Sequence, residues 1–345
     1  MRTELLSLFL SVFVLYCFLR PGNNQDVAEG RRLRLTRSES SDCQQHDRQT
    51  TFELPHSIIT KTLYAAEISA MTYSTRLFQT PEKGDFDFME QFFDLDDVAL
   101  VARRDGVCYA AFRGTVATNL LDIYQIFDDK PKSVNGCLVR RGYHRAYFAL
   151  YYNRFMAKVE DCMNTGGTEL VVTGHSQGGS NAMIAFLDLQ RFNPTAITFG
   201  AMRALVEPCD TVDSSKIYRY TNVGYNLYDG WSNCLEIKGV HMGHSIMLDA
   251  NSTSPAVYLG LDEDINRSPI TRDVHSGWIY WDALEAMLEK AKLERDLDAC
   301  TSRSPDAPLT VKLRGWEDGH WCSRPDECQT GSTCVEGECV AIEGN

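Results

Sequence analysis

The stretch LVVTGHSQGGSNAMIAF, residues 170–186, decides the fold. It passes from a β-branched run through Gly174, His175, Ser176, Gln177 and Gly178 into small and apolar residues. This pattern predicts a strand, a tight turn and a helix, with the serine hydroxyl raised above the sheet at the turn. The helix N-terminus would then point its N–H groups at the serine. The alternative interpretation is a tight turn that only needs glycine.

The neighbouring segments continue the alternation of strands and helices. Residues 98–115 look like two strands joined by a two-residue turn at Asp105-Gly106. We expect helices over residues 57–73, 145–163 and 180–190, and strands over residues 169–176, 196–201 and 216–224. This order predicts an α/β fold with a largely parallel central sheet flanked by helices.

Length and composition limit the domain organisation. The 345 residues, 43% of them hydrophobic, allow one domain of about 250 residues plus tails. We expect a signal peptide or signal anchor over residues 1–21, a polar basic linker over 22–42, one main domain over 43–312 and a cysteine-rich segment over 313–345. The formal net charge of −13 disfavours nucleic acid as a partner, because the chain would repel phosphate groups.

The N-terminus predicts entry into the secretory pathway. An apolar run of 15 residues, 5–19, lies between Arg2 and Arg20. It fits a cleaved signal peptide or, alternatively, an uncleaved anchor that holds the protein at a membrane. We therefore expect a protein that is secreted or lies on the outer face of a membrane, with glycosylation sequons at Asn251 and Asn266. The basic stretch RRLRLTR, residues 31–37, is a solvated linker, a dibasic processing site or an RxLR-like targeting motif.

In a protein of the secretory pathway, the twelve cysteines indicate disulfide bonds, since disulfides persist outside the cytosol. The four of the C-terminal segment, Cys322, Cys328, Cys334 and Cys339, predict disulfides in a stretch with too few apolar residues for a core; zinc is the alternative. The partner of this segment stays open. By position, Cys43 pairs with Cys300 and Cys209 with Cys234, although connectivity cannot be deduced from sequence. We expect Cys108, on a buried strand, to be a small core residue.

A second local signal is FRGT, residues 112–115, at the end of a strand. Acyl transfer needs two N–H donors for the negatively charged oxygen of the tetrahedral intermediate. One comes from the residue after the nucleophile and one from another loop. Gln177 and Thr115 are placed to supply them. The alternative for FRGT is an ordinary strand end with a buried arginine.

Five segments together resemble one known family, the class 3 or fungal-type triacylglycerol lipases. They are AAFRGT, VRRGYHRAY, ELVVTGHSQGGSNAM, AITFGAMR and YRYTN, which follow the family's order over about residues 43–300. The resemblance implies an α/β-hydrolase-like fold, serine esterase chemistry without cofactor or metal, and a lid after the FRGT loop. Gln177 stands where leucine is more familiar in the family.

The stretch NLLDIYQIFDDKPK, residues 119–132, also predicts a lid from its own pattern. Leu120, Leu121, Tyr124 and Phe127 fall near one helical face. Such a helix could cover the site in water and turn its apolar face toward lipid. The alternative is a surface helix packed permanently on the core.

A serine nucleophile also requires a histidine and an orienting carboxylate. Among the late histidines we favour His275, because TRDVHSGWIYW, residues 271–281, resembles the family's final histidine segment; His241 and His244 are the alternatives. The sequence departs from the family where the family has the orienting aspartate. Aligned on YRYTN, that position falls on Tyr225 or Asn226, and Asp229 follows a few residues later. We expect Asp229 to orient His275, with Asn226 as the alternative.

These observations predict a serine ester hydrolase acting on lipid esters of the acylglycerol type through an acyl-enzyme intermediate. Its substrate would be bound at a lipid–water interface. The VGYNLYDGW segment, residues 223–231, leaves open an alternative of another class. That alternative is a catalytically weak or inactive secreted binding or effector protein on the same scaffold.

Overall fold

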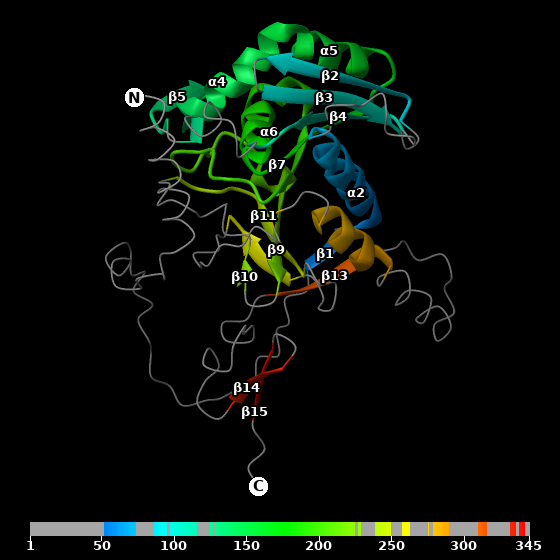
Figure 1. Cartoon of the computed structure of the whole chain (residues 1–345), viewed down its shortest axis with the longest axis vertical. Coiled ribbons are helices and arrows are strands. Elements are labelled where there is room, and N and C mark those ends of the chain that lie inside the picture. The colour runs from blue at the N-terminus through cyan, green and yellow to red at the C-terminus, as the bar shows by residue number, and fades with distance from the viewer. Residues whose placement is uncertain are drawn as a thin grey trace, which may run out of the picture. The chain divides into compact units, whose positions relative to one another are not determined.

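A computed structural model of the whole chain (Figure 1) describes thirteen segments. They are residues 52–73, 86–94, 97–115, 125–126, 128–224, 227–228, 239–249, 257–262, 275, 279–289, 310–315, 332–335 and 338–341. The predicted signal segment, the linker, both sequons and Cys43, Cys234 and Cys300 lie outside them. No helix in the described segments is long and apolar enough to cross a membrane.

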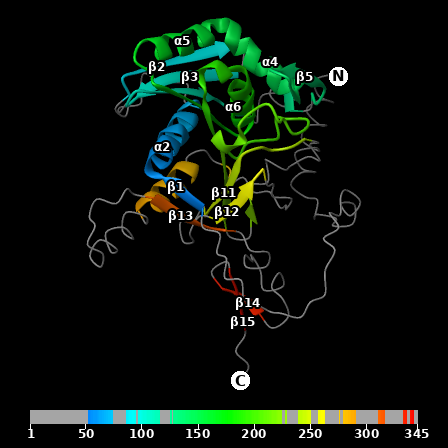
Figure 2. The ribbon, with the colours of Figure 1, turned by 180° about the vertical axis from the view of Figure 1, so that it is seen from behind.

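Within the described residues, the centre of the fold is a mixed sheet of eleven strands. Figures 1 and 2 show this sheet from opposite sides. Its order is β1-β13-β12-β11-β9-β8-β7-β4-β3-β2, and β10 pairs with β9. The strands are β1 (Phe52–Pro55), β2 (Phe88–Asp94), β3 (Asp97–Arg104), β4 (Val107–Phe112), β7 (Glu169–His175), β8 (Thr195–Phe199), β9 (Ile217–Gly224), β10 (Leu227–Tyr228), β11 (His244–Asp249), β12 (Val257–Leu261) and β13 (Thr310–Gly315).

The central strands β4, β7, β8, β9 and β11 are parallel, as predicted. Antiparallel pairs lie toward both edges: β2 with β3 and β3 with β4 on one side, and β11 with β12 and β1 with β13 on the other. Strand β13 runs across residue 312, where we expected the main domain to end. Two smaller hairpins complete the strands, β5 (Pro131–Val134) with β6 (Cys137–Arg140) and β14 (Ser332–Val335) with β15 (Glu338–Ala341).

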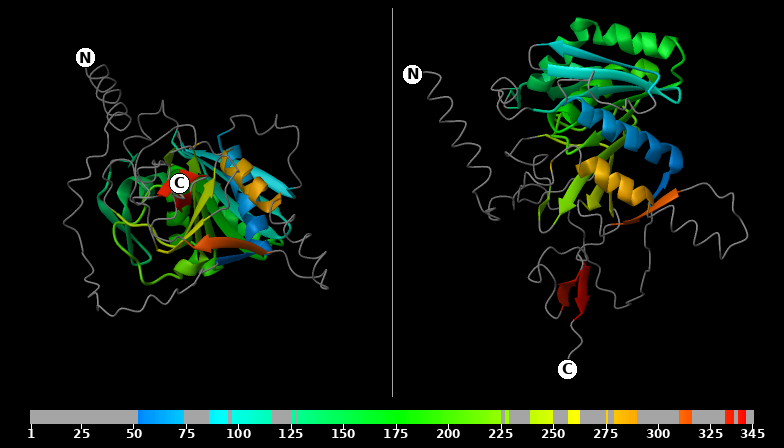
Figure 3. Two further views of the ribbon diagram at one scale, coloured as in Figure 1. Left: turned by 90° about the horizontal axis from the view of Figure 1, so that it is seen from below. Right: turned by 45° about the vertical axis from the view of Figure 1, so that its right-hand side comes forward.

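Helices cover both faces of the sheet. One face packs against α4 (Arg141–Leu150), the π-helical turn Tyr151–Phe155, α5 (Met156–Asn164) and α6 (Gln177–Asp188). The other packs against α2 (His56–Met71) and the helical residues 279–289, which lie on one side in the right-hand view of Figure 3. The α/β class predicted from the sequence is therefore confirmed.

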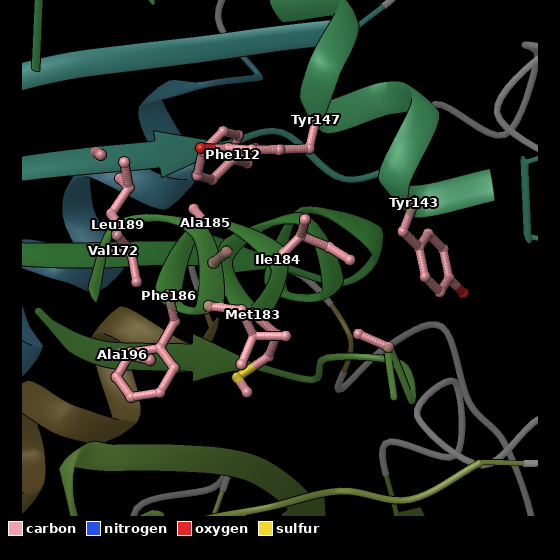
Figure 4. Close-up of a cluster of buried hydrophobic side chains, with 14 of the residues drawn as sticks. Phe112, Tyr143, Tyr147, Val172, Met183, Ile184, Ala185, Phe186, Leu189 and Ala196 are labelled. Atoms are coloured by element: carbon pink, nitrogen blue, oxygen red, sulfur yellow. The ribbon is translucent and has the colours of Figure 1, made fainter. Parts of the chain in front are cut away.

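Alternation along β4 and β7 creates the two cores. Successive side chains of a strand point to opposite faces. Phe112 and Val172 accordingly join the core beneath α4 and α6, which Figure 4 shows, whereas Tyr109 and Val171 join the core beneath α2. Because both faces are covered, β4 is buried along its whole length, and the sequence shows a continuous apolar run there.

The turn between β3 and β4 also agrees with the sequence. Asp105 and Gly106 both have positive φ, 51° and 75°. This is the conformation that a two-residue hairpin turn of this type requires.

Two cysteine predictions are wrong. Cys108 is buried, as expected, but it is bonded to Cys162, with Cα atoms 6.1 Å apart. Cys209 is bonded to Cys137 rather than to Cys234. In both cases the fold brings distant segments together: α5 packs on β4, and an isolated bridge between Val139 and Leu205 sets the residues before Cys209 beside β6.

Candidate active site

The candidate nucleophile lies between β7 and α6. Ser176 follows the last residue of β7 and has φ 60° and ψ −129°, a backbone conformation that glycine adopts easily and other residues rarely do. Its N–H donates to Phe199 O at the end of β8 (2.9 Å), and its carbonyl accepts from Gly179 N in the first turn of α6 (3.0 Å). Strand and helix thus hold the serine backbone in a strained position.

The flanking glycines are required because backbone segments approach each other closely. A Cβ at Gly174 would lie 2.2 Å from Gly178 O, and a Cβ at Gly178 would lie 2.0 Å from Phe112 O. Neither neighbour is a side chain that could rotate away. The close crossing of α6 over the ends of β7 and β4 therefore agrees with the elbow predicted from the sequence.

The FRGT loop lies directly against this turn. A Cβ at Gly114 would lie 2.2 Å from Tyr73 Oη, 2.5 Å from His175 O and 2.8 Å from Ser176 Cβ. One residue later, the Thr115 hydroxyl donates to the side-chain oxygen of Gln177. The structure therefore brings Thr115, Ser176 and the N-terminus of α6 together.

The histidine next to the nucleophile is buried in an aromatic pocket. His175 is only 4% exposed, and its Nδ1 lies 2.8 Å from the hydroxyl of Tyr73. Its ring centroid is 4.5 Å from that of His275 and 5.8 Å from that of Tyr280. Burial and, next, the charge of His275 hold the pKa of His175 well below its usual value of 6.5, although the His275 backbone acts in the opposite direction. His175 is therefore neutral at physiological pH.

His275, which we favoured as the catalytic histidine, lies beside His175, the residue before the candidate nucleophile. Its ring stacks at a tilt of 44° on His175. The hydrogen bonds that Ser176 makes within the described residues are those of its backbone.

The alternative His244 has a different environment. Its Nδ1 lies 3.0 Å from Tyr258 Oη and its Nε2 lies 3.2 Å from Ser215 O, and the ring stacks on Phe52 and Tyr218. These contacts are those of a structural histidine at the start of β11. His241 is buried, 8% exposed.

The candidates for the orienting residue, Tyr225, Asn226 and Asp229, lie outside the described residues. Of the predicted lid, only Gln125, Ile126 and the residues from Asp128 onward are described, and Gln125 and Ile126 are helical. Two residues that contact the site, Tyr73 and Gln125, were not predicted from the sequence. Tyr73 is 102 positions before His175, and no local motif marks either residue.

A comparison with protein families gives the site a context. Residues 109–223 match the family model described as Lipase (class 3), and this segment includes the FRGT loop, Ser176 and all but the last residue of β9. Over this segment the chain resembles the class 3 lipases. A search of curated proteins found no match to the sequence.

Solved structures of fungal lipases share the fold at low identity. The Rhizomucor miehei triacylglyceride lipase is 21% identical, with a TM-score of 0.50 over 66% of this chain and 99% of that one. The Penicillium expansum triacylglycerol lipase is 18% identical, with a TM-score of 0.50 over 66% and 96% of the two chains. A fungal lipase–inhibitor complex is 20% identical, with a TM-score of 0.54 over 67% and 98%. These likenesses show an α/β-hydrolase-type fold.

Proposed function

We propose that this protein is a lipase of the class 3 type, a serine ester hydrolase that acts on lipid esters of the acylglycerol type. The observation that carries the proposal is the position of Ser176, strained in the turn between β7 and α6 with the Thr115 loop against it. Strain of this kind persists only where surrounding structure enforces it, and it is concentrated at functional sites. Two proteins that share the fold are titled triacylglyceride and triacylglycerol lipases.

The proposed reaction has two halves. The Ser176 hydroxyl attacks the ester carbonyl carbon while His275 accepts its proton, and the resulting tetrahedral oxyanion receives hydrogen bonds from the N–H groups of Thr115 and Gln177. The C–O bond then breaks, and His275 donates its proton to the departing alcohol. Water then attacks the carbonyl carbon of the acyl-enzyme and gives a proton to His275. The bond between that carbon and the Ser176 oxygen breaks, His275 returns the proton to the serine oxygen, and the fatty acid leaves. We assign the role of orienting His275 to Asp229, with Asn226 as the alternative.

The neutral state of His175 supports the assignment of His275 as the residue that accepts the proton. His275 becomes positively charged in both halves of the reaction, 4.5 Å from the His175 ring by centroid distance. Two charges at that separation would repel by about 4 kcal/mol at an effective dielectric constant of about 20. Because burial keeps His175 uncharged, this repulsion is absent.

The disulfides also support a proposed cellular location. The pairs Cys108–Cys162 and Cys137–Cys209 fit an oxidising compartment. Together with the apolar run at residues 5–19, they support a secreted protein, or one on the outer face of a membrane, that meets its substrate at a lipid–water interface.

A fluorophosphonate probe tests the proposal, because it reacts covalently with activated serines. We expect labelling of the wild-type protein, complete loss in Ser176→Ala and strong loss in His275→Ala. The matched control is Ser180→Ala, which removes a buried serine hydroxyl from α6, the helix that follows Ser176, and should keep the label. Absence of labelling in folded wild-type protein would favour the binding or effector alternative. A chain-length series of nitrophenyl esters, with and without an oil interface, then defines the substrate.

A further inference from the structure

The side chain of Gln177 lies in an unusual place. It is 2% exposed at the first position of α6, where the family resemblance leads one to expect leucine. A buried primary amide is destabilising unless its oxygen and nitrogen both find partners. Here both do: Oε1 accepts from the Thr115 hydroxyl, and Nε2 donates to the side-chain oxygen of Gln125.

These hydrogen bonds continue to a carboxylate. Gln125 Nε2 donates to Asp97 Oδ2 over 3.1 Å. Four side chains from four segments are thereby joined in one chain: Asp97 at the start of β3, Gln125, Gln177 on α6, and Thr115 after β4. We call these four residues the amide relay.

The carboxylate fixes the direction of the whole relay. An ionised carboxylate accepts hydrogen bonds and does not donate them, so Gln125 must turn its NH₂ group toward Asp97 and its oxygen toward Gln177. Gln177 must then turn its own NH₂ group toward Gln125 and its oxygen toward Thr115. The Thr115 hydroxyl is left as the donor at the end of the relay.

We infer that Gln177 is a positioning residue, whose amide, oriented by Asp97 through Gln125, directs the Thr115 hydroxyl hydrogen toward α6 and fixes the Thr115 loop beside Ser176. The inference rests on the proposed function, in which the N–H groups of Thr115 and Gln177 hold the oxyanion. Since the relay joins the side chains of these two residues, it sets the spacing between their N–H groups. Errors of about 1 Å in such spacing can lower turnover by about 100-fold.

The direction of the relay gives a specific test by substitution. Gln177→Glu has nearly the same shape, but both of its oxygens only accept, so Gln125 must reverse and turn its oxygen toward Asp97. Asp97→Asn removes that conflict, because an asparagine NH₂ group can donate to the reversed Gln125. We therefore expect Gln177→Glu to lower kcat by about 10- to 100-fold with KM within about twofold. The double variant Asp97→Asn/Gln177→Glu should recover most of the lost kcat.

Two further variants keep the test independent of folding. Gln177→Leu removes the relay without an added charge, and it should lower kcat about 10-fold at an unchanged unfolding temperature. Gln190→Glu, the same substitution beyond the far end of α6, should leave kcat unchanged, since the Gln190 amide donates to Phe186 O on α6 and is not part of the amide relay.

The outcomes separate the inference from the proposed function. Measured on a soluble nitrophenyl ester, an unlabelled and inactive wild-type protein would overturn both. A wild-type protein whose fluorophosphonate labelling depends on Ser176, but whose kcat is the same in Gln177→Glu, would overturn the inference alone. The same conclusion would follow if the double variant were no faster than Gln177→Glu.

Discussion

Replacing Ser176 with glycine should make the protein more stable than replacing it with alanine. Both variants lose the hydroxyl, so they differ only in the Cβ atom at φ 60° and ψ −129°. Holding a non-glycine residue in such a conformation costs about 1–3 kcal/mol. Glycine gives back about 0.5–1 kcal/mol of this through the greater entropy of its unfolded chain. The net advantage of glycine is therefore about 1 kcal/mol, or an unfolding temperature about 2–4 °C higher in a domain of this size.

The control is the same pair of substitutions at Ser180, four residues later. Ser180 is inside α6 with ordinary helical geometry, where glycine is less stable than alanine by about 1 kcal/mol. The glycine and alanine variants at positions 176 and 180 should therefore differ in opposite directions. The assay is urea unfolding followed by tryptophan fluorescence, with scanning calorimetry at one fixed scan rate. If Ser176→Gly proved no more stable than Ser176→Ala, the backbone at Ser176 would not be strained and the elbow assignment would fail.

Three further perturbations test other parts of the structure. Gly178→Ala should abolish soluble expression or strongly lower the unfolding temperature, because its Cβ would lie 2.0 Å from Phe112 O; retention of wild-type stability in a thermal melt would contradict the close crossing of α6 and β4. Replacing Cys108 and Cys162 together by alanine should lower the free energy of unfolding by about 2–4 kcal/mol in urea titrations, because the disulfide is lost. The wild-type protein should lose at least as much stability under reducing conditions, and an unchanged free energy of unfolding in the double variant would contradict the disulfide. Because burial holds the pKa of His175 below 6.5, the unfolded chain binds a proton there that the folded chain does not, so the associated stability is complete above pH 6.5 and is lost as pH falls below it. His175→Gln should reduce the slope of unfolding free energy against pH below 6.5 by up to about 1.4 kcal/mol per pH unit, whereas an unchanged slope would show that His175 is not buried in its neutral form.

Local patterns accounted for much of the fold. The alternation of apolar runs predicted α2, β7, α6, β8 and β9 within a few residues, because each pattern reflects which side of its own element is buried. The turn at Asp105-Gly106 could also be predicted from the sequence, since two adjacent positive φ values are a property of two neighbouring residues. The disulfide partners were not, because the bonded cysteines are 54 and 72 residues apart and their pairing depends on how α5 and β6 pack.

In the candidate site, too, some features are local in the sequence and others depend on tertiary packing. The sequence by itself predicted the turn around Ser176, because the steric needs of a strand–turn–helix are met within a few consecutive residues. It also proposed Thr115 and Gln177 as the oxyanion donors, from the end of another strand and from the residue after the serine. Only the tertiary structure decided that His175 is buried against Tyr73 and His275, and that Gln177 is joined to Asp97 through Gln125. Those contacts connect residues 28 to 102 positions apart, and whether a buried polar group finds a partner depends on the packing of whole elements rather than on its neighbours in the chain.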